Sequence, residues 1–248
     1  EEYVAAKANI TLFQRPEDLL VFNSENEYTR SIATQSKADK VGFPEQGTAH
    51  VQDGKFAYGE HIICSIDVLQ IPGPHNVSNA LAAIDATWKF TQDSVVIEKG
   101  LHEFKGLKHR LSFVREIDNV SYYDDSIATT PGSAIAALRA FEGPKVIILG
   151  GSFKGSDFTG LAQEIVKHDV QAVLIGDEAP TIADSLKKVG FETFEIIDQP
   201  TMQKIVSRAS ELAKPGGVVL LSPAAASFGL FKNYADRGDQ FISAVTQL

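Results

Sequence analysis

The 248-residue chain has one cysteine, one methionine and one tryptophan. A lone cysteine, Cys64, cannot form a disulfide within the chain, so we expect a reducing, cytoplasmic location. No apolar run approaches the roughly 20 residues of a membrane-spanning helix. No basic segment followed by an apolar one marks a signal peptide. We therefore expect no association with a membrane.

Positive charge is also in deficit. The chain has 23 Lys and Arg residues against 32 Asp and Glu residues, a formal net charge of −9. Surfaces that bind nucleic acid are generally basic, so this balance argues against a nucleic-acid partner. It leaves room for a local cationic pocket that binds a phosphate or a carboxylate. Nothing in the sequence requires an oligomer, and we expect a monomer.

A Walker phosphate loop is missing as well, since the chain contains no Gly-Lys-Ser or Gly-Lys-Thr. The Gly-rich stretch "LGGSFKGSDF" (149–158) fails this pattern because Lys154 precedes Gly155. It also lacks the G-x-G-x-x-G of a dinucleotide-binding fold. What remains is a loop that presents one ammonium beside backbone N–H groups, which suits a carboxylate or a phosphate.

Two patterns of hydrophobic residues divide the chain near Gly106. Before it, we expect strands at 19–22 and 39–43, a hairpin around Asp53-Gly54, a further strand over 62–71, and helices ending near 34 and covering 75–90 and 92–103. After it, paired strands at 111–117 and 120–125 precede apolar strands at 145–150, 171–176, 191–196 and 217–222, each separated by an amphipathic helix. This alternation predicts an α/β fold with a mostly parallel sheet covered on both faces.

Ligands of open parallel sheets bind outside the carboxyl ends of the strands. Three such ends are polar or Gly-rich: 124–126 (Asp-Asp-Ser), 150–152 (Gly-Gly-Ser) and 222–223 (Ser-Pro). The alternative is that these are ordinary polar loops, as strand-to-helix connections usually are.

Other polar residues have equally plain alternatives. Asn76 and Asn79 could cap a helix, or their amides could bind the edge of an adenine. Arg110 could be solvated, or could reach a phosphate. Lys7, on an expected helix, could simply be solvated.

Seven segments, taken in order, resemble the Mur ligases, and most of all their D-glutamate-adding branch. They are "YVAAKANI", "VFNSENE", "GPHNVSNALAA", "GLKHRLSFV", "YYDDSIATTPGSAIAAL", "ILGGSFKGSDF" and "LLSPAAASFGLFKNYADRGDQF". The resemblance covers essentially the whole chain, and the last segment is the one specific to this branch. It implies that 1–106 form the later part of the central ATP-binding domain, a mixed sheet with helices whose phosphate loop is missing. It implies a Rossmann-like, doubly wound domain over 107–248 that binds the incoming amino acid.

The resemblance also implies an activity. It predicts an ATP-dependent ligase of peptidoglycan synthesis that adds D-glutamate to UDP-N-acetylmuramoyl-L-alanine through an acyl phosphate, with ATP and Mg²⁺ as cofactors. The chain opens without an initiator Met, as though within a helix, and we expect the family's phosphate loop and upstream metal-binding residues to precede it. We therefore expect this chain to be inactive alone.

The resemblance assigns roles to individual residues. Catalytic roles fall to Lys7, which the family carbamylates and places near a magnesium ion, and to Lys154. Nucleotide-binding roles fall to Asn76, Asn79, His109, Arg110 and Asp125. Thr129 and Lys154 match residues that hold one carboxylate of D-glutamate, and Ser227, Phe228 and Tyr234 belong to the remainder of its pocket.

Two positions depart from the family's D-S-K-A-T-N, which reads "DSIATT" here. Ile127 replaces a lysine near the phosphates, and Thr130 replaces an asparagine. The loss of that cation favours an alternative function, a non-catalytic module that binds D-glutamate or a nucleotide. A third interpretation, a folate polyglutamate-adding ligase, conflicts with the ending "SPAAASFGLFKNYADRG".

Overall fold

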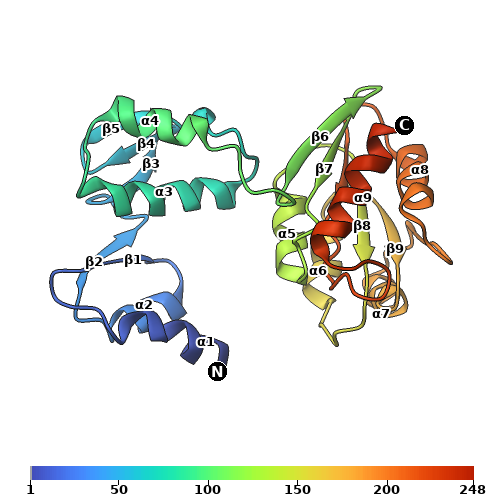
Figure 1. The fold of residues 1–248 in the computed structure, drawn as a ribbon, viewed down its shortest axis with the longest axis horizontal. Coiled ribbons are helices and arrows are strands. Elements are labelled where there is room, and N and C mark those ends of the chain that lie inside the picture. The colour runs from blue at the N-terminus through green and yellow to red at the C-terminus, as the bar shows by residue number, and fades with distance from the viewer. Residues whose placement is uncertain (1) are drawn as a thin grey trace. The chain divides into compact units, whose positions relative to one another are not determined.

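The computed structural model describes residues 2–248, which form two compact units. The first contains the chain up to Gln70 together with Pro74–Lys105, and the second contains Ile71–Gly73 and Gly106–Leu248. Figure 1 shows both units as layers of helices and strands. Within residues 2–248, no helix is both long and apolar enough to cross a bilayer.

The first unit begins with two short helical segments and a two-stranded parallel sheet. Its elements are α1 (Glu2–Ala8), the 3-10 helix η1 (Asn9–Thr11), β1 (Leu19–Asn23), α2 (Glu27–Ala33) and β2 (Asp39–Phe43). The side chain of Asn26 caps α2 by accepting hydrogen bonds from the backbone N–H groups of Tyr28 and Thr29.

The rest of the first unit is an antiparallel sheet packed against two helices. The strands are β3 (Ala49–Gln52), β4 (Lys55–Tyr58) and β5 (His61–Ser65), and the helices are α3 (Pro74–Trp88) and α4 (Ser94–Glu103). Asp53 and Gly54 both have positive φ, 49° and 70°, as a type I′ hairpin turn requires. The strand expected over 62–71 is wrong beyond Ser65. There the Ser65 hydroxyl accepts the N–H of Asp67 and starts the 3-10 helix η2 (Ile66–Val68).

The second unit is built on one six-stranded sheet in the order β10-β9-β8-β11-β7-β6. The strands are β6 (Ser112–Ile117), β7 (Val120–Asp124), β8 (Lys145–Gly150), β9 (Val170–Ile175), β10 (Phe194–Ile196) and β11 (Val218–Leu221). Only the β6–β7 pair is antiparallel. Of the strand expected over 191–196, only β10 forms. Phe191 instead donates its N–H to the Leu186 carbonyl at the end of the preceding helix.

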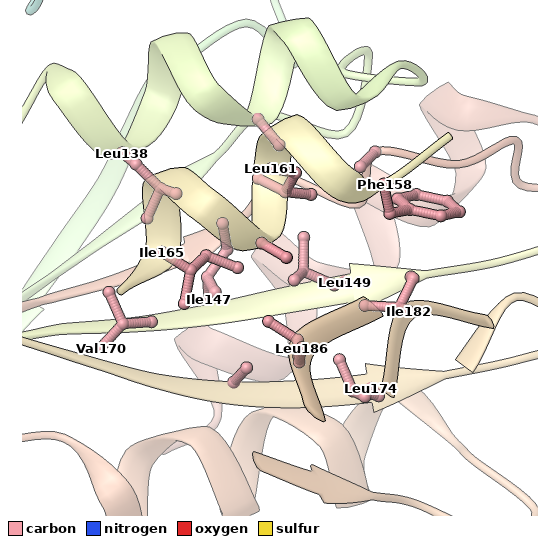
Figure 2. Close-up of a cluster of buried hydrophobic side chains, with 14 of the residues drawn as sticks. Leu138, Ile147, Leu149, Phe158, Leu161, Ile165, Val170, Leu174, Ile182 and Leu186 are labelled. Carbon is pink, nitrogen blue, oxygen red and sulfur yellow. The ribbon is translucent and has the colours of Figure 1, made fainter. Parts of the chain in front are cut away.

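Helices cover both faces of this sheet. On one face, α5 (Pro131–Arg139), α6 (Thr159–Ile165) and α7 (Ala179–Lys188) share a buried core that includes Leu138, Leu161 and Leu186 (Figure 2). On the other, α8 (Met202–Leu212) and α9 (Tyr234–Thr246) pack on the sheet through Ile205 and Phe241. The predicted α/β class is confirmed, and the carboxyl ends of β7, β8 and β11 open toward one edge.

Candidate functional site

Three loops are tied together at the carboxyl edge of the second unit's sheet. Asp125, after β7, accepts a 2.7 Å hydrogen bond from the Ser222 hydroxyl, after β11. The N–H of Gly150 donates to the Pro223 carbonyl at 2.7 Å, and that of Ser152 to the Ala226 carbonyl at 2.9 Å. The three predicted strand ends therefore form one hydrogen-bonded group of loops, which we call the loop edge: residues 124–127, 150–154 and 222–227.

Asp125 is a buried carboxylate held by neutral donors. Besides Ser222, it accepts the backbone N–H of Leu111 at 3.2 Å. Burial raises its pKa to about 7. The two hydrogen bonds and the charge of Arg110 act in the opposite direction, and the charge of Asp124 adds to the rise. Its charge therefore changes near neutral pH.

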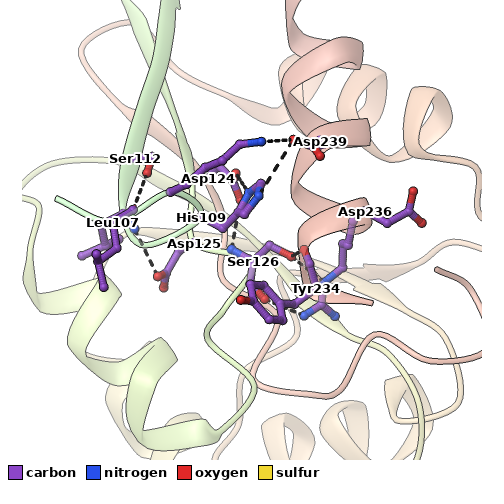
Figure 3. Close-up of polar contacts among 12 residues, drawn as sticks. Leu107, His109, Ser112, Asp124, Asp125, Ser126, Tyr234, Asp236 and Asp239 are labelled. Atoms are coloured by element: carbon purple, nitrogen blue, oxygen red, sulfur yellow. Dashed lines mark hydrogen bonds and ion pairs between the residues drawn. The ribbon is translucent and has the colours of Figure 1, made fainter. Parts of the chain in front are cut away.

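Asp124 and His109 form a buried pair beside it (Figure 3). The distance between His109 Nδ1 and Asp124 Oδ2 is 2.6 Å, and the other Asp124 oxygen accepts the N–H of Ser126 at 3.0 Å. Burial raises the pKa of Asp124, and the hydrogen bonds from His109 and Ser126 oppose that rise. A Cβ on Gly238 would lie 2.2 Å from His109 Nδ1, so only glycine fits at this turn of α9.

Arg237 is the largest fully buried side chain and fixes the turn after β11. Its Nε donates to the Ser126 hydroxyl at 2.9 Å and one terminal nitrogen donates to the Ser126 carbonyl at 2.8 Å. Both terminal nitrogens also reach the Ala225 carbonyl at 3.2 Å. Burial lowers its pKa to about 10, so it stays charged at neutral pH. Sequence reasoning assigned Arg237 no role, although it lies in the quoted segment "KNYADRGDQF".

The predicted residues of the D-glutamate pocket lie on or beside the loop edge, with different exposure. Ser227 is buried and Thr129 is half-buried, whereas Phe228 and the Lys154 side chain are exposed. Tyr234 begins α9, accepts the Ser126 hydroxyl at its carbonyl, and sets its ring at 6.1 Å and nearly perpendicular to that of His109. The edge therefore combines an exposed cation with hydroxyl groups, a combination that suits a carboxylate ligand.

The two departures from the family pattern have clear local environments. Thr130 is the N-cap of α5, and its hydroxyl accepts the N–H of Ser133. The substitution of asparagine by threonine therefore preserves a capping residue. Ile127 is half-buried, and its N–H donates to the His109 carbonyl at 3.1 Å.

In the first unit, Asn76 and Asn79 are linked to each other, with the Asn79 amide donating to Asn76 Oδ1 at 3.1 Å. Helix α3 begins at Pro74, so neither asparagine is the N-cap and the capping alternative is wrong. Lys7 is exposed on α1, with its ammonium 5.4 Å from the centre of the Tyr3 ring.

A magnesium site is not formed by these residues alone. Within residues 2–248, no three or more His, Cys, Asp or Glu side chains gather in a way that could hold a metal ion. Lys7 as an ammonium offers no lone pair to a metal. The described residues therefore do not by themselves make up a metal site of that kind.

The sequence matches two family profiles, and together they account for most of the chain. The Mur ligase middle domain matches residues 1–87, and the Mur ligase glutamate ligase domain matches residues 109–225. The chain belongs to the Mur ligase family. The resemblance found in the sequence is thereby confirmed.

Individual relatives agree with this. The chain is 36% identical over 261 residues to UDP-N-acetylmuramoylalanine–D-glutamate ligase of Clostridium tetani, and 37% identical over 252 residues to that of Latilactobacillus sakei. All of this chain aligns, against 56% and 55% of those proteins, so it spans about half the length of the Mur ligases it matches. MurF of Acinetobacter baumannii shares the fold at a TM-score of 0.73 and 18% identity, over 98% of this chain and 55% of that one.

Proposed function

We propose that the second unit binds D-glutamate as the incoming amino acid of an ATP-dependent Mur ligase, one that extends UDP-N-acetylmuramoyl-L-alanine in cytoplasmic peptidoglycan synthesis. The observation that carries this proposal is the loop edge. It joins three strand ends through the Asp125–Ser222 and Ser152–Ala226 hydrogen bonds, and one of its loops carries the exposed Lys154. The D-glutamate ligases among the relatives support the choice of amino acid.

A dicarboxylic amino acid needs two separate anion-binding groups. In this proposal Lys154 and Thr129 bind one carboxylate, and Ser227 binds the other from the turn that Arg237 fixes. Charge-assisted hydrogen bonds of this kind are short and roughly twice as strong as neutral ones. Held at two points, the amino acid can present its amine in one orientation to an acyl phosphate.

In the first unit, we propose that Asn76 and Asn79 contact the adenine of ATP. In the second unit, His109, Arg110 and Asp125 would contact the ribose and phosphates of a nucleotide. Lys7 would act as a carbamate near magnesium in the complete enzyme. The roles of Asn76, Asn79 and Lys7 rest on the middle-domain match and, for the asparagines, on their amide hydrogen bond. The roles in the second unit rest on the match to the glutamate ligase domain. ATP supplies the phosphoryl group that activates the muramoyl-alanine carboxylate.

A second candidate is a non-catalytic module that binds D-glutamate or a nucleotide. Ile127 favours it, because this position lacks the lysine that the family places near the phosphates. D-glutamate binding is common to the ligase and to the first form of this module, and the two candidates differ in turnover.

Calorimetry with D-glutamate and L-glutamate tests the shared part in this chain. We expect D-glutamate to bind more tightly, and Lys154→Ala to weaken binding about tenfold, or about 1.4 kcal/mol. Lys188→Ala, at an exposed lysine of α7, is the matched control. Equal binding of the two enantiomers would refute a D-glutamate site.

Phosphate release separates the candidates. It is measured with ATP, Mg²⁺, UDP-N-acetylmuramoyl-L-alanine and D-glutamate, for this chain and for a version extended upstream. Turnover by the extended protein alone supports the ligase with this chain inactive by itself. Turnover by neither supports the binding module.

A further inference from the structure

Glu178 holds the loop that carries Lys154 at two points. It directly precedes α7, and its own N–H donates to the Gly151 carbonyl at 3.1 Å. Its side-chain Oε1 accepts the backbone N–H of Lys154 at 2.7 Å. The Glu178 side chain is fully buried, so these bonds lie beneath the loop and not on its surface.

The same loop is fitted closely against its neighbours on both sides. A Cβ on Gly151 would lie 2.0 Å from the Ala226 carbonyl oxygen, and one on Gly176 would lie 2.7 Å from the Gly151 carbonyl oxygen. Toward the turn after β11, the Ser152 N–H donates to the carbonyl of Ala226, the residue before Ser227. The position of Lys154 relative to Ser227 is therefore set by Glu178 on one side and by the turn after β11 on the other.

The carboxylate of Glu178 meets the loop through one oxygen only. Its Oε2 is buried and has no hydrogen-bond partner among residues 2–248. The hydrogen bond from the Lys154 N–H to Oε1 is thus the one polar contact of the Glu178 side chain with the Lys154 loop among the described residues. Removing that oxygen removes this contact, whereas a glutamine can still supply it.

We propose that Glu178 is a positioning residue that sets the spacing between Lys154 and Ser227, and through it the affinity for a dicarboxylic amino acid. This inference rests on the proposed function, because it assigns the two carboxylates to these two residues. Glu178 acts through the Lys154 loop and does not itself touch the ligand.

Three variants of this chain test the inference: Glu178→Ala, Glu178→Gln and, as control, Asp177→Ala. Asp177 is the adjacent carboxylate and is exposed. Amide hydrogen exchange at Lys154, followed by NMR, reports the hydrogen bond directly. Calorimetry reports D-glutamate affinity.

We expect Glu178→Ala to accelerate exchange at Lys154 by roughly tenfold or more and to weaken D-glutamate binding by about tenfold. Glu178→Gln keeps an acceptor and should stay within about threefold of the wild type in both measurements, as should Asp177→Ala. If Glu178→Ala does not fold, Glu178→Asp replaces it, since its shorter side chain withdraws the acceptor from the loop.

Unchanged exchange at Lys154 in the alanine variant would overturn the inference. So would faster exchange with unchanged affinity, or a loss in Glu178→Gln as large as that in Glu178→Ala. If the wild-type chain does not bind D-glutamate, the proposed function fails and the affinity claim fails with it, while exchange still shows whether Glu178 holds the loop.

Discussion

Two regions of the second unit bury carboxylates in opposite ways. At the loop edge, Asp125 has hydroxyl and backbone donors, and burial raises its pKa to about 7. Between α5 and α6, Glu164 lies among Arg139, Lys167 and His168, and hydrogen bonds from these residues, that of Arg139 above all, hold its pKa well below the usual range.

The difference separates a site from a scaffold. Glu164 joins two helices and is matched by nearby cations, so its burial stabilises the fold at neutral pH. Asp125 is buried without a matching salt bridge, which leaves its charge responsive to whatever binds at the edge. A carboxyl group whose pKa is raised by burial at the carboxyl edge of a parallel sheet is therefore a candidate functional group.

The largest effect is expected at Arg237, the buried cation of α9 that donates hydrogen bonds to the loop edge. Arg237→Met leaves the Ala225 and Ser126 carbonyls without these donors. Because each buried acceptor left unsatisfied costs about 1–3 kcal/mol, we expect a loss of about 3–5 kcal/mol in the free energy of unfolding. Arg237→Lys keeps the charge but loses the planar guanidinium. Its free energy of unfolding should therefore lie between those of the wild type and Arg237→Met. Urea unfolding measures this. A methionine variant as stable as the wild type would show that the edge does not depend on the guanidinium.

The next effect is a change of pH dependence at Asp125. Its folded pKa of about 7 lies above the ordinary value of 3.8, so the folded state binds more protons between these values. Its contribution to stability is therefore fully present below pH 3.8 and is lost as the pH rises through 7. Asp125→Asn stays neutral, and we expect it to be more stable than the wild type by roughly 2–4 kcal/mol at pH 8.

Below pH 4 that advantage should vanish. Urea unfolding of both proteins across pH 3–8 measures the difference, and Asp177→Asn at an exposed position is the control. A constant difference at every pH would mean that Asp125 is not the titrating group.

The fold and the location of the loop edge could be predicted from the sequence for a physical reason. The apolar strands such as "KVIILG" and "GVVLLS" identify a parallel sheet, and the carboxyl ends of its strands share one side whatever the loops contain. Local geometry was predictable where one residue dictates it, as at the Asp53-Gly54 turn. The prediction of a strand over 62–71 was wrong beyond Ser65, because the Ser65 hydroxyl accepts the N–H of Asp67 and begins a 3-10 helix. No hydrophobic pattern reveals such a hydrogen bond.

The buried polar partners could not be predicted in the same way. Arg237, Glu178 and Glu164 are charged residues that a sequence places on the surface by default. Their burial follows from contacts with residues between 3 and 111 positions away, such as Lys167 for Glu164 and Ser126 for Arg237. Gly238 was a sequence clue, because a glycine inside a helix usually has a packing reason. The sequence could not show that the group packed against it is the His109 ring.

Ile127 offers a way to sharpen the comparison, because a lysine there would add a second cation to the loop edge in addition to the exposed Lys154. If the proposed function holds, Ile127→Lys in an upstream-extended protein should raise turnover about tenfold, or about 1.4 kcal/mol in the barrier, because it adds positive charge near the proposed phosphate site. Ile127→Met, of similar length without charge, is the control. Equal or lower turnover in the lysine variant would contradict this expectation.

The smallest effect is expected at Glu164, where removing the charge leaves hydrogen-bonding capacity in place. Its pKa is depressed, so its stabilising contribution is present above the ordinary value of 4.5 and is lost as the pH falls below it. We expect Glu164→Gln to cost about 1 kcal/mol at pH 7, because Arg139 and Lys167 are largely solvated. The difference should shrink toward pH 3, and at pH 7 it should shrink in 1 M salt.

Glu192→Gln, at an exposed glutamate, provides the matched control. Opposite slopes of the Glu164→Gln and Asp125→Asn differences with pH would establish that scaffold and site carboxylates respond to protons in opposite directions within one unit. Parallel slopes would mean that burial, and not the partners, governs both.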